Sequence, residues 1–466
     1  MLMQNFSNEN RKLALSKFEN MLKSNKVFFF DSEEFEEIVY FYLDTGKIKL
    51  ANKAIELSLS QHPSSIRLKL IKVELLIFEN RLKDAEKIIF QLEKIEPTFD
   101  EIYIQKAAIL SKQNLHAEAI KVLKFALKHT DDLIDIHSLI GMEYLFIEKF
   151  DVAAEHFKIC LAINNEDYTA LYNVIYCLDM NELHNEAIVF LDKFIDGNPY
   201  SEVAWHQLGR QYFYLEKYNE AIRAFDYAIL VDEYFVGAYF EKAKILEIQN
   251  KYEEAISNYL ITLELDDPTA FSYLQIASCY EKLENSKQAM RFYYKATQED
   301  PMMEESWLHL VKIYLKEDNV QKALYFIQKA LEVDPTNLDY INLFAEINIK
   351  LNLFEEAAVA FQDSITLGED RIEIFLALTD VYHFIGDYQD AINLLNEAKK
   401  IFGDYVEITY RISGNYFLLR NEKEGLFHLE NALKKDFDYF EIIKEVFPNV
   451  FEKESVKKLI AKYRNA

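Results

Sequence analysis

The chain has 466 residues, of which 50% are hydrophobic and 28% charged, and its formal net charge is −26 at neutral pH. Non-specific binding to nucleic acid and to anionic membranes depends on basic groups, so this balance argues against both partners. Gly and Pro are scarce (10 and 7 residues), as a largely helical chain requires. No stretch reaches the roughly 20 apolar residues of a transmembrane helix, so we expect no direct membrane insertion.

Residues 1–31 precede the regular part of the chain. Arg11–Lys23 has the spacing of an amphipathic helix. Its apolar face would consist of Leu15, Phe18 and Leu22. Asp31 and Ser32 have the chemistry of an N-cap for the following helix. We expect residues 1–31 to be a capping helix and connector; a membrane or partner peptide is the alternative. The first residues lack the apolar core of a signal peptide.

Residues Ser201–Phe235 show the pattern of two short amphipathic helices joined by a turn. The first helix has Trp205, Leu208, Gly209 and Tyr212 on one face, and the second has Ala221, Phe225 and Ala228. Leu215–Asn219 interrupts the spacing, and Tyr218-Asn219 is expected to form the turn. Gly209 and Ala221 are small, which predicts a close approach of the two helix backbones there.

This pattern recurs every 34 residues. The small residue at Ala221 belongs to a series that we call the anchor positions: Ala51, Ala85, Ala119, Ala153, Ala187, Ala221, Ala255, Ala289, Ala323, Ala357, Ala391 and Gly425. The residue four places later is always large and apolar: Ile55, Ile89, Leu123, Phe157, Leu191, Phe225, Tyr259, Tyr293, Ile327, Phe361, Leu395 and Leu429. Such agreement in phase predicts one repeated structural unit.

Other positions keep the same phase. Tyr dominates nine residues before the anchor, at Tyr42, Tyr144, Tyr212, Tyr280, Tyr314, Tyr382 and Tyr416. An aromatic residue often stands sixteen before it, at Phe35, Tyr103, Trp205, Tyr239, Tyr273, Trp307 and Phe375. Proline stands twelve after it, where a second helix should stop, at Pro63, Pro97, Pro199, Pro301 and Pro335.

A helix–turn–helix unit of 34 residues with this pattern resembles the tetratricopeptide repeat (TPR) family. The resemblance covers residues 32–439 as twelve units, with capping helices at 440–466. It implies an all-α protein, a right-handed superhelical solenoid in which each unit buries its apolar face against its neighbours. Four positions depart from the pattern: Lys69, His137, Asn348 and Thr409.

The residues after the last unit carry helical patterns. We expect helices at Phe440–Phe447 and Glu454–Tyr463, with Pro448 between them. The apolar side of the second helix would be Val456, Leu459, Ile460 and Tyr463, and its basic residues are Lys457, Lys458, Lys462 and Arg464. Cations suit a helix C-terminus, and a docking role for them is the alternative.

The chain has three cysteines, Cys160, Cys177 and Cys279, which we expect to be buried free thiols rather than redox groups. This fits a reducing compartment, and we predict a cytoplasmic protein. Heavy use of Phe, Tyr, Ile, Lys and Asn suggests a bacterial source.

The sequence contains no pattern that indicates catalysis. The ten histidines are scattered, without HExxH or a Cys/His cluster at metal-ligand spacing. Neither a P-loop, a GxSxG motif nor a dinucleotide-binding fingerprint is present. We therefore expect no catalytic residue, no metal site, no cofactor and no enzymatic activity.

The resemblance implies that first helices line a concave ligand-binding surface. Each first helix has a second face fifteen, eleven and eight residues before the anchor, where apolar residues and cations replace the polar residues expected on a surface. The candidate contacts are Tyr172, Tyr176, His206, Arg210, Phe213, Phe240, Lys244 and Lys312. They would bind a peptide that carries an acidic group.

Two observations limit this prediction. The aromatic residues could instead pack between repeats, and the cations could balance nearby glutamates. The carboxylate clamp of chaperone-binding relatives is missing, because its positions hold residues such as Glu36, Tyr40 and Glu74.

The predicted function is a non-catalytic scaffold that binds a protein or peptide in this groove. The alternatives are a ligand-responsive regulatory sensor and an assembly factor for an envelope or secretion complex. The charge disfavours an RNA-binding helical repeat. Partner identity and oligomeric state stay open.

Overall fold

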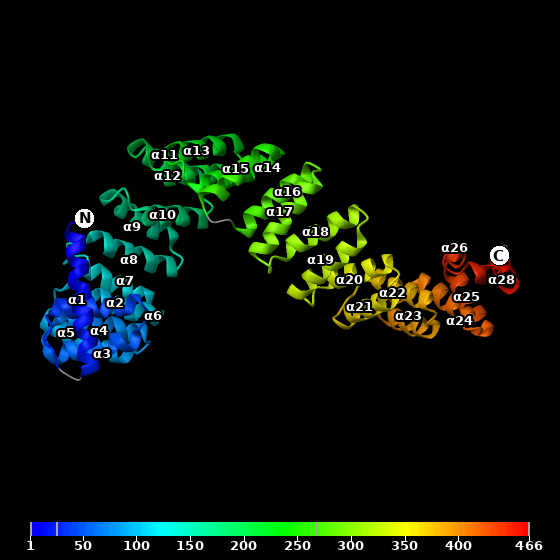
Figure 1. Ribbon diagram of the computed structural model, residues 1–466, viewed down its shortest axis with the longest axis horizontal. Helices are drawn as coiled ribbons and strands as arrows, with labels where there is room; N and C mark the ends of the chain where they lie inside the picture. The colour runs from blue at the N-terminus through cyan, green and yellow to red at the C-terminus, as the bar shows by residue number, and fades with distance from the viewer. Residues whose placement is uncertain (1, 25–26, 267–268, 404, 465–466) are drawn as a thin grey trace. The chain divides into compact units, whose positions relative to one another are not determined.

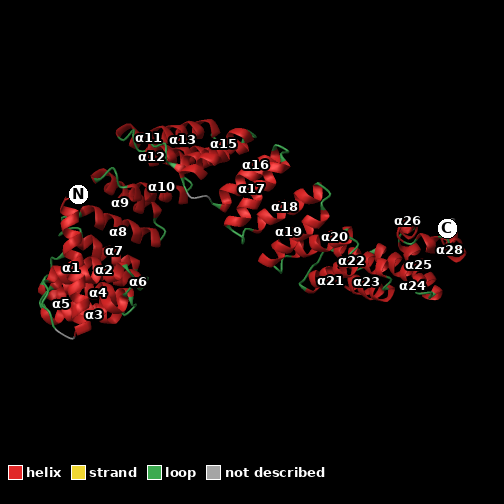
Figure 2. Cartoon of the chain, viewed as in Figure 1, coloured by secondary structure: helices red, strands yellow, loops and turns green. Residues whose placement is uncertain are grey.

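The computed structural model describes residues 2–24, 27–266, 269–403 and 405–464. All regular structure in these ranges is helical, as Figure 2 shows, which confirms the predicted all-α class. Within the same ranges, no helix is both long and apolar enough to span a bilayer. The chain divides into two compact parts, which we call the N-terminal body (residues 1–238) and the C-terminal body (residues 239–466).

The N-terminal body consists of helices that pack against their sequence neighbours (Figure 1). Their bounds are α1 (Leu2–Ser24), α2 (Ser32–Asp44), α3 (Ile48–Gln61), α4 (Ile66–Phe78), α5 (Leu82–Ile95), α6 (Asp100–Lys112), α7 (His116–Ala126), α8 (Leu133–Phe146), α9 (Phe150–Ile163), α10 (Tyr168–Met180), α11 (His184–Gly197), α12 (Glu202–Tyr214) and α13 (Tyr218–Val231).

The C-terminal body follows the same scheme and contains most of α14. Its helices are α14 (Val236–Ile248), α15 (Tyr252–Leu265), α16 (Ala270–Lys282), α17 (Ser286–Glu299), α18 (Glu304–Lys316), α19 (Val320–Val333), α20 (Leu338–Lys350), α21 (Phe354–Thr366), α22 (Ile372–Ile385), α23 (Tyr388–Phe402), α24 (Val406–Leu418), α25 (Glu422–Lys435), η1 (Asp438–Phe440), α26 (Glu441–Val446), α27 (Pro448–Phe451) and α28 (Glu454–Arg464). The even-numbered helices from α2 to α24 begin about 34 residues apart, so the sequence period is also the structural period.

The predicted helix pair at 201–235 is confirmed as α12 and α13, but the predicted turn is wrong. Tyr218 is the first residue of α13, and the turn lies at Leu215–Lys217. Glu216 has a left-handed backbone, with φ of 56°. The Lys217 N–H donates to Tyr212 O (2.9 Å) and the Glu216 N–H donates to Phe213 O (2.9 Å). This is the Schellman ending of a helix.

The left-handed residue recurs five places before every anchor. The positions are Gly46, Asn80, Asn114, Glu148, Glu182, Glu216, Asn250, Glu284, Asp318, Asn352, Gly386 and Arg420. Only two are glycine, the residue that adopts positive φ without steric penalty. The sequence therefore carried no glycine signal for these turns, although their position is as regular as that of the anchor.

Gly209 is close to a side chain rather than to the backbone of the second helix. A Cβ atom at Gly209 would lie 2.5 Å from Phe225 Cε1, and one at Gly141 would lie 2.7 Å from Phe157 Cζ. Each ring therefore occupies the space that a side chain on the first helix would need. The nearest neighbour of Gly209 is thus the ring four residues after the anchor, and the close approach of the two backbones stays a prediction.

Sizes at these two positions are matched along the chain. The pairs, twelve before and four after the anchor, are Val39/Ile55, Val73/Ile89, Ala107/Leu123, Gly141/Phe157, Ile175/Leu191, Gly209/Phe225, Ala243/Tyr259, Ala277/Tyr293, Val311/Ile327, Ala345/Phe361, Thr379/Leu395 and Ser413/Leu429. Every one of these residues is buried. In the sequence, every aromatic member of a pair is combined with Gly or Ala, whereas larger first-helix residues occur only with Ile or Leu, as close packing requires.

Prolines end second helices as predicted, and aromatic residues fix the following helix to them. α3, α5, α11, α17 and α19 each end two residues before a proline. Trp205 Nε1 donates to Pro199 O (3.0 Å) and Trp307 Nε1 to Pro301 O (3.0 Å). The Tyr103 hydroxyl likewise donates to Pro97 O (2.7 Å).

The first and last described helices pack against the repeats beside them. In α1, Phe18 is fully buried, with Ala14 and Met21 beside it and Leu15 and Leu22 at the edges. At the other end, the Phe447 ring lies against Gly414 of α24, and Val456 and Ile460 of α28 are buried. The two predicted helices correspond to α26 and α28, and Pro448 lies between them as the first residue of the short helix α27. The assignment of caps at 1–31 and 440–466 around twelve units stays a prediction.

The three cysteines lie in the core. Cys160, Cys177 and Cys279 are free and buried, as expected. Burial raises the pKa of Cys160 and Cys177 to about 11 and that of Cys279 to about 12. These thiols therefore stay protonated at neutral pH and are poor nucleophiles.

The matched pair can be tested by exchanging one size combination for another. Gly209→Val should destabilise the α12–α13 pair by about 1–3 kcal/mol because the side chain meets the Phe225 ring. Phe225→Ile alone should destabilise it through a void. The double variant recreates the Val/Ile pair found elsewhere in the chain and should recover part of the loss. Denaturant unfolding with hydrogen exchange of α12 measures this; a double variant no better than the sum of the singles would contradict it.

The turn predicts opposite effects of two substitutions at one site. Glu216→Val places a β-branched residue at φ of 56° and should destabilise the protein by about 1–2 kcal/mol. Glu216→Gly relieves the left-handed strain and should be neutral or stabilising by up to about 1 kcal/mol. Arg223→Gly, inside α13, is the control and should be destabilising by about 1 kcal/mol. Equal effects of Gly and Val at 216 in thermal unfolding would refute the turn assignment.

Candidate peptide-binding surface

The first helices of the repeats share a face, which we call the first-helix face: the positions fifteen, eleven and eight residues before the anchor. In the N-terminal body, α2 contacts α4, α4 contacts α6, and α10 contacts α12 directly. Equivalent positions on these helices therefore lie next to one another and can form a continuous lining.

An apolar pocket of about 520 Å³ lies partly on this face and partly beside it at α6 and α8. Ile104 and Ala108 of α6 line it together with Leu139, Met142 and Phe146 of α8. Phe146 is 58% exposed, and Leu139 and Met142 are also exposed. Large apolar side chains left open in a hollow are typical of a binding surface.

A polar pair stands at the rim of the apolar pocket. His116 Nδ1 lies 2.8 Å from Glu143 Oε2, and the His116 ring stacks on Phe146 with centroids 5.0 Å apart. The pair holds the exposed Phe146 ring in place. The candidate residues predicted from the sequence begin at Tyr172, one repeat after α8, and therefore do not include this pocket. The signal available in the sequence was the set of apolar residues at 139, 142 and 146.

A second, acidic pocket of about 310 Å³ lies at α2, α4 and α6. Its lining includes Glu36, Tyr40, Arg67, Glu74 and Glu101. Burial raises the pKa of Glu36 and of Glu74, and burial with the nearby Glu74 raises the pKa of Tyr40 to about 12. Carboxylates held together and partly desolvated favour a cation. The residues at the positions of the carboxylate clamp thus form a pocket that favours a cationic group, whereas a carboxylate clamp binds an anionic one.

The candidate residues in the N-terminal body differ in accessibility. Tyr172 and Tyr176 of α10 are 43% and 48% exposed, and the Tyr176 ring lies edge-on to Phe150. Phe213 is half-buried, with its ring 6.1 Å from that of Tyr218. The two tyrosines are therefore the accessible members of this group.

His206 and Arg210 are already engaged within the protein. His206 lies between the rings of Phe225 (5.6 Å) and Phe235 (5.2 Å), and neither of its ring nitrogens has a hydrogen-bond partner in the described structure. Burial lowers its pKa to about 4. Arg210 Nη2 donates to the Tyr214 hydroxyl (2.9 Å). Both residues contribute to packing on α12.

Three candidates lie in the C-terminal body. The Phe240 ring is half-buried between Tyr259 (5.4 Å) and Phe271 (5.7 Å). Lys244 forms a salt bridge with Glu241 (3.0 Å). Lys312 is exposed and has no salt bridge among the described residues. The structure thus describes the eight predicted contacts as two separate groups, one in each body.

The described residues contain no group of three or more His, Cys, Asp or Glu side chains arranged to hold a metal ion.

Fold and surface together define a helical-repeat protein built from paired helices. Residues 206–268 match one model of the tetratricopeptide repeat, and residues 272–301 and 304–337 match a second. Helices in these segments keep the same period as the others from α2 to α25. The chain therefore contains tetratricopeptide repeats in the matched segments between residues 206 and 337.

Solved structures of related fold are distant. YrrB, titled a TPR protein with an unusual peptide-binding site, is 17% identical, with 40% of this chain and 96% of that chain covered and a TM-score of 0.35. A tetratricopeptide repeat protein from Parabacteroides merdae is 14% identical over 53% and 97% of the chains, with a TM-score of 0.36. The Cut9–Hcn1 structure is 14% identical over 89% and 95%, with a TM-score of 0.32. Because these TM-scores are low, the type of repeat is assigned from the sequence matches and the helix period alone.

A search of curated proteins gave no match.

Burial of His206 predicts a pH dependence. The folded state holds the pKa near 4, below the ordinary value of 6.5, so the unfolded chain binds the proton more readily. The contribution of His206 to stability is complete above about pH 6.5 and declines as the pH falls toward 4. His206→Phe should remove an acid-induced loss on the order of 2 kcal/mol. Urea unfolding at pH 7 and pH 5 measures the free energy of unfolding, with Trp205→Phe as a control that does not titrate. The same loss of stability between the two pH values in the wild type, His206→Phe and Trp205→Phe would contradict the prediction.

Proposed function

We propose that the protein is a non-catalytic scaffold that binds a peptide segment of a partner protein on the first-helix face. The observation that carries this proposal is the apolar pocket at α6 and α8, with Leu139, Met142 and Phe146 open to solvent. Tetratricopeptide repeats support a protein-interaction role in general, and a pocket of this kind provides an anchor for an apolar side chain.

The two pockets suggest the chemistry of the peptide. Both are lined by α6, because Gln105 faces the acidic pocket and Ile104 the apolar one. A peptide with an apolar anchor and a basic residue a short distance away fits both. This replaces an acidic peptide as the preferred ligand, since Arg210 and Lys244 already have partners in the protein. Tyr172 and Tyr176 extend the proposed contact surface.

We further propose a cytoplasmic location. The three cysteines are buried and free, which suits a reducing compartment.

The binding surface can be tested with purified protein and a displayed library of random peptides. Selected sequences should combine a large apolar residue with Lys or Arg. Met142→Ser/Phe146→Ser should weaken binding of a selected peptide at least tenfold, because each lost apolar contact contributes about 1.5–3 kcal/mol. Glu74→Gln/Glu101→Gln should weaken it less and reduce its salt dependence.

Leu230→Ser is the matched control, because Leu230 is 78% exposed on α13 away from the pocket residues. It should leave the affinity unchanged in fluorescence anisotropy. Full binding by the Met142/Phe146 variant would rule out the apolar pocket. Tyr172→Ala/Tyr176→Ala tests whether the surface extends to α10.

A further inference from the structure

A stacked aromatic pair recurs between the two helices of several repeats in the C-terminal body. Its members stand nine residues before and three residues after the anchor. Tyr280 stacks on Phe292 with centroids 5.6 Å apart, and Tyr314 stacks on Phe326 at 5.3 Å with an interplanar angle of 5°. Tyr416 and His428 repeat the arrangement at 5.3 Å. The pair fills the space over the junction of the two helices.

Both members are replaced in α20 and α21. Asn348 stands where tyrosine is usual, and Ala360 stands where Phe292 and Phe326 stand in the two preceding repeats. Asn348 is buried and donates to Phe344 O (3.0 Å). Ala360 lines a pocket of about 720 Å³. The equivalent space one repeat earlier, lined by Tyr314 and Phe326, measures about 570 Å³.

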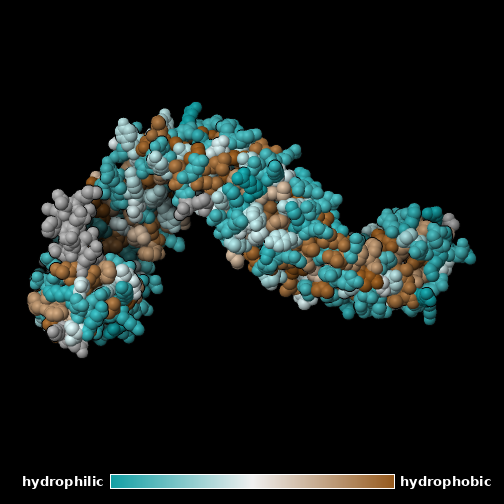
Figure 3. All heavy atoms as spheres, in the orientation of Figure 1, coloured by the Kyte–Doolittle hydropathy of each residue, from teal (hydrophilic) through white to brown (hydrophobic). Residues whose placement is uncertain are grey.

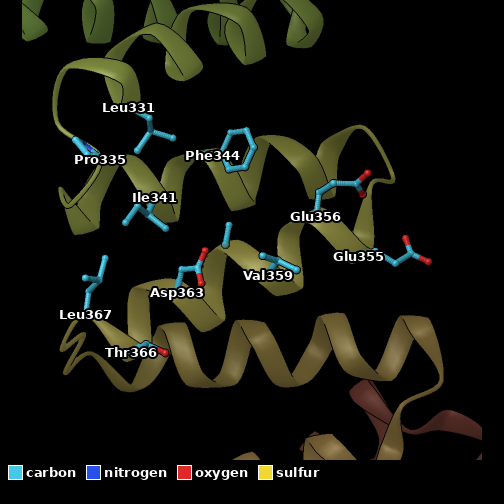
Figure 4. A pocket seen from close by; sticks show the side chains of 11 residues that line it. Leu331, Pro335, Ile341, Phe344, Glu355, Glu356, Val359, Asp363, Thr366 and Leu367 are labelled. Carbon is cyan, nitrogen blue, oxygen red and sulfur yellow. The ribbon is translucent and has the colours of Figure 1, made fainter.

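The lining of this pocket is apolar at its base. Figure 4 shows Leu331, Ile341 and Phe344 on one side, and Val359 on the α21 side. Val359 is 61% exposed and Leu367 is 49% exposed. Figure 3 shows hydrophobic side chains among hydrophilic ones over the part of the chain around α19 to α21. The base can therefore take a large apolar side chain.

The rim of the pocket is acidic. Glu355 and Glu356 lie at one end and Asp363 projects between the ends (Figure 4). All three are exposed and have no salt bridge among the described residues, and no cation is in the lining. The pocket one repeat earlier has Gln321 and Lys322 in place of the two glutamates. The acidic rim thus distinguishes this pocket from the one in the preceding repeat.

We propose that the pocket at α20 and α21 binds a basic peptide segment, which inserts a large apolar or aromatic side chain and places Arg or Lys beside the three carboxylates. The inserted side chain occupies the space beside Ala360, where the two preceding repeats carry phenylalanine. The three carboxylates are complementary to cationic side chains and select against acidic segments. This site lies in the C-terminal body and is independent of the first-helix face at α2 to α10.

The probe is the amidated peptide RRGFGRR labelled with fluorescein, with RRGSGRR as the peptide of equal charge. At physiological ionic strength the first should bind the full chain at least tenfold more tightly. Replacing its phenylalanine with photoreactive benzoylphenylalanine should cross-link it to residues of the pocket such as Phe344, Val359 and Leu367. Equal affinity for the two peptides, or cross-links only elsewhere, would overturn the proposal.

Two variants separate the base from the rim. Ala360→Phe restores the residue of the preceding repeats without changing the charge and should lower the yield of cross-links to α21 at least tenfold. Glu355→Gln/Glu356→Gln should lower the affinity about threefold or more and weaken its salt dependence. The matched control is Glu253→Gln/Glu254→Gln, which removes two exposed carboxylates from the same places on α15.

Each outcome is decisive for this site. If Ala360→Phe leaves the yield of cross-links to α21 unchanged, the proposed insertion into the pocket is wrong. If the glutamine substitutions in α15 and in α21 weaken binding equally, the peptide is attracted by the net charge alone and the proposal is also wrong. Met142→Ser/Phe146→Ser should leave RRGFGRR cross-linking at α21 intact, so failure here is distinguishable from failure of the first-helix surface.

Discussion

The contact between the residue twelve places before the anchor and the residue four places after it holds each helix pair together. At Gly209 and Gly141 the facing ring occupies the volume of a missing side chain. Interiors at crystal-like density tolerate neither a void nor an excess methyl group. The two positions therefore vary together, and a phenylalanine on one helix is possible only with Gly or Ala on the other.

The tight turn fixes the geometry in which this contact can form. A left-handed residue five places before every anchor reverses the chain within three residues, and its hydrogen bonds close the end of each first helix. Because the turn never changes length, the anchor, the ring and the first-helix position stay in phase over the described helices α2 to α25. Asn, Glu, Asp and Arg accept this conformation because the contact beside it compensates for the local strain.

Sequence period predicted the helices, the buried anchors and the helix ends at proline, since all three repeat with the same spacing. It misplaced the turn because Tyr218-Asn219 has turn chemistry while Glu216 has none. It proposed His206 and Arg210 as binding residues, and it did not predict that His206 would lie between two rings or that Arg210 would donate to Tyr214. Periodicity identifies which positions share a face; it does not say which side chains on that face find partners, and the pockets depend on those partners.

A repeat that keeps its core can change its surface at little energetic expense. The two residues before the anchor are Glu355 and Glu356 in α21, Gln321 and Lys322 in α19, and Asn219 and Glu220 in α13, while the anchor beside them stays Ala. Stability depends on the positions that keep the same kind of residue every 34 residues. Binding chemistry depends on the positions that differ from one repeat to the next. Two neighbouring repeats with the same fold can therefore present opposite charges, so each binding site must be argued from its own residues.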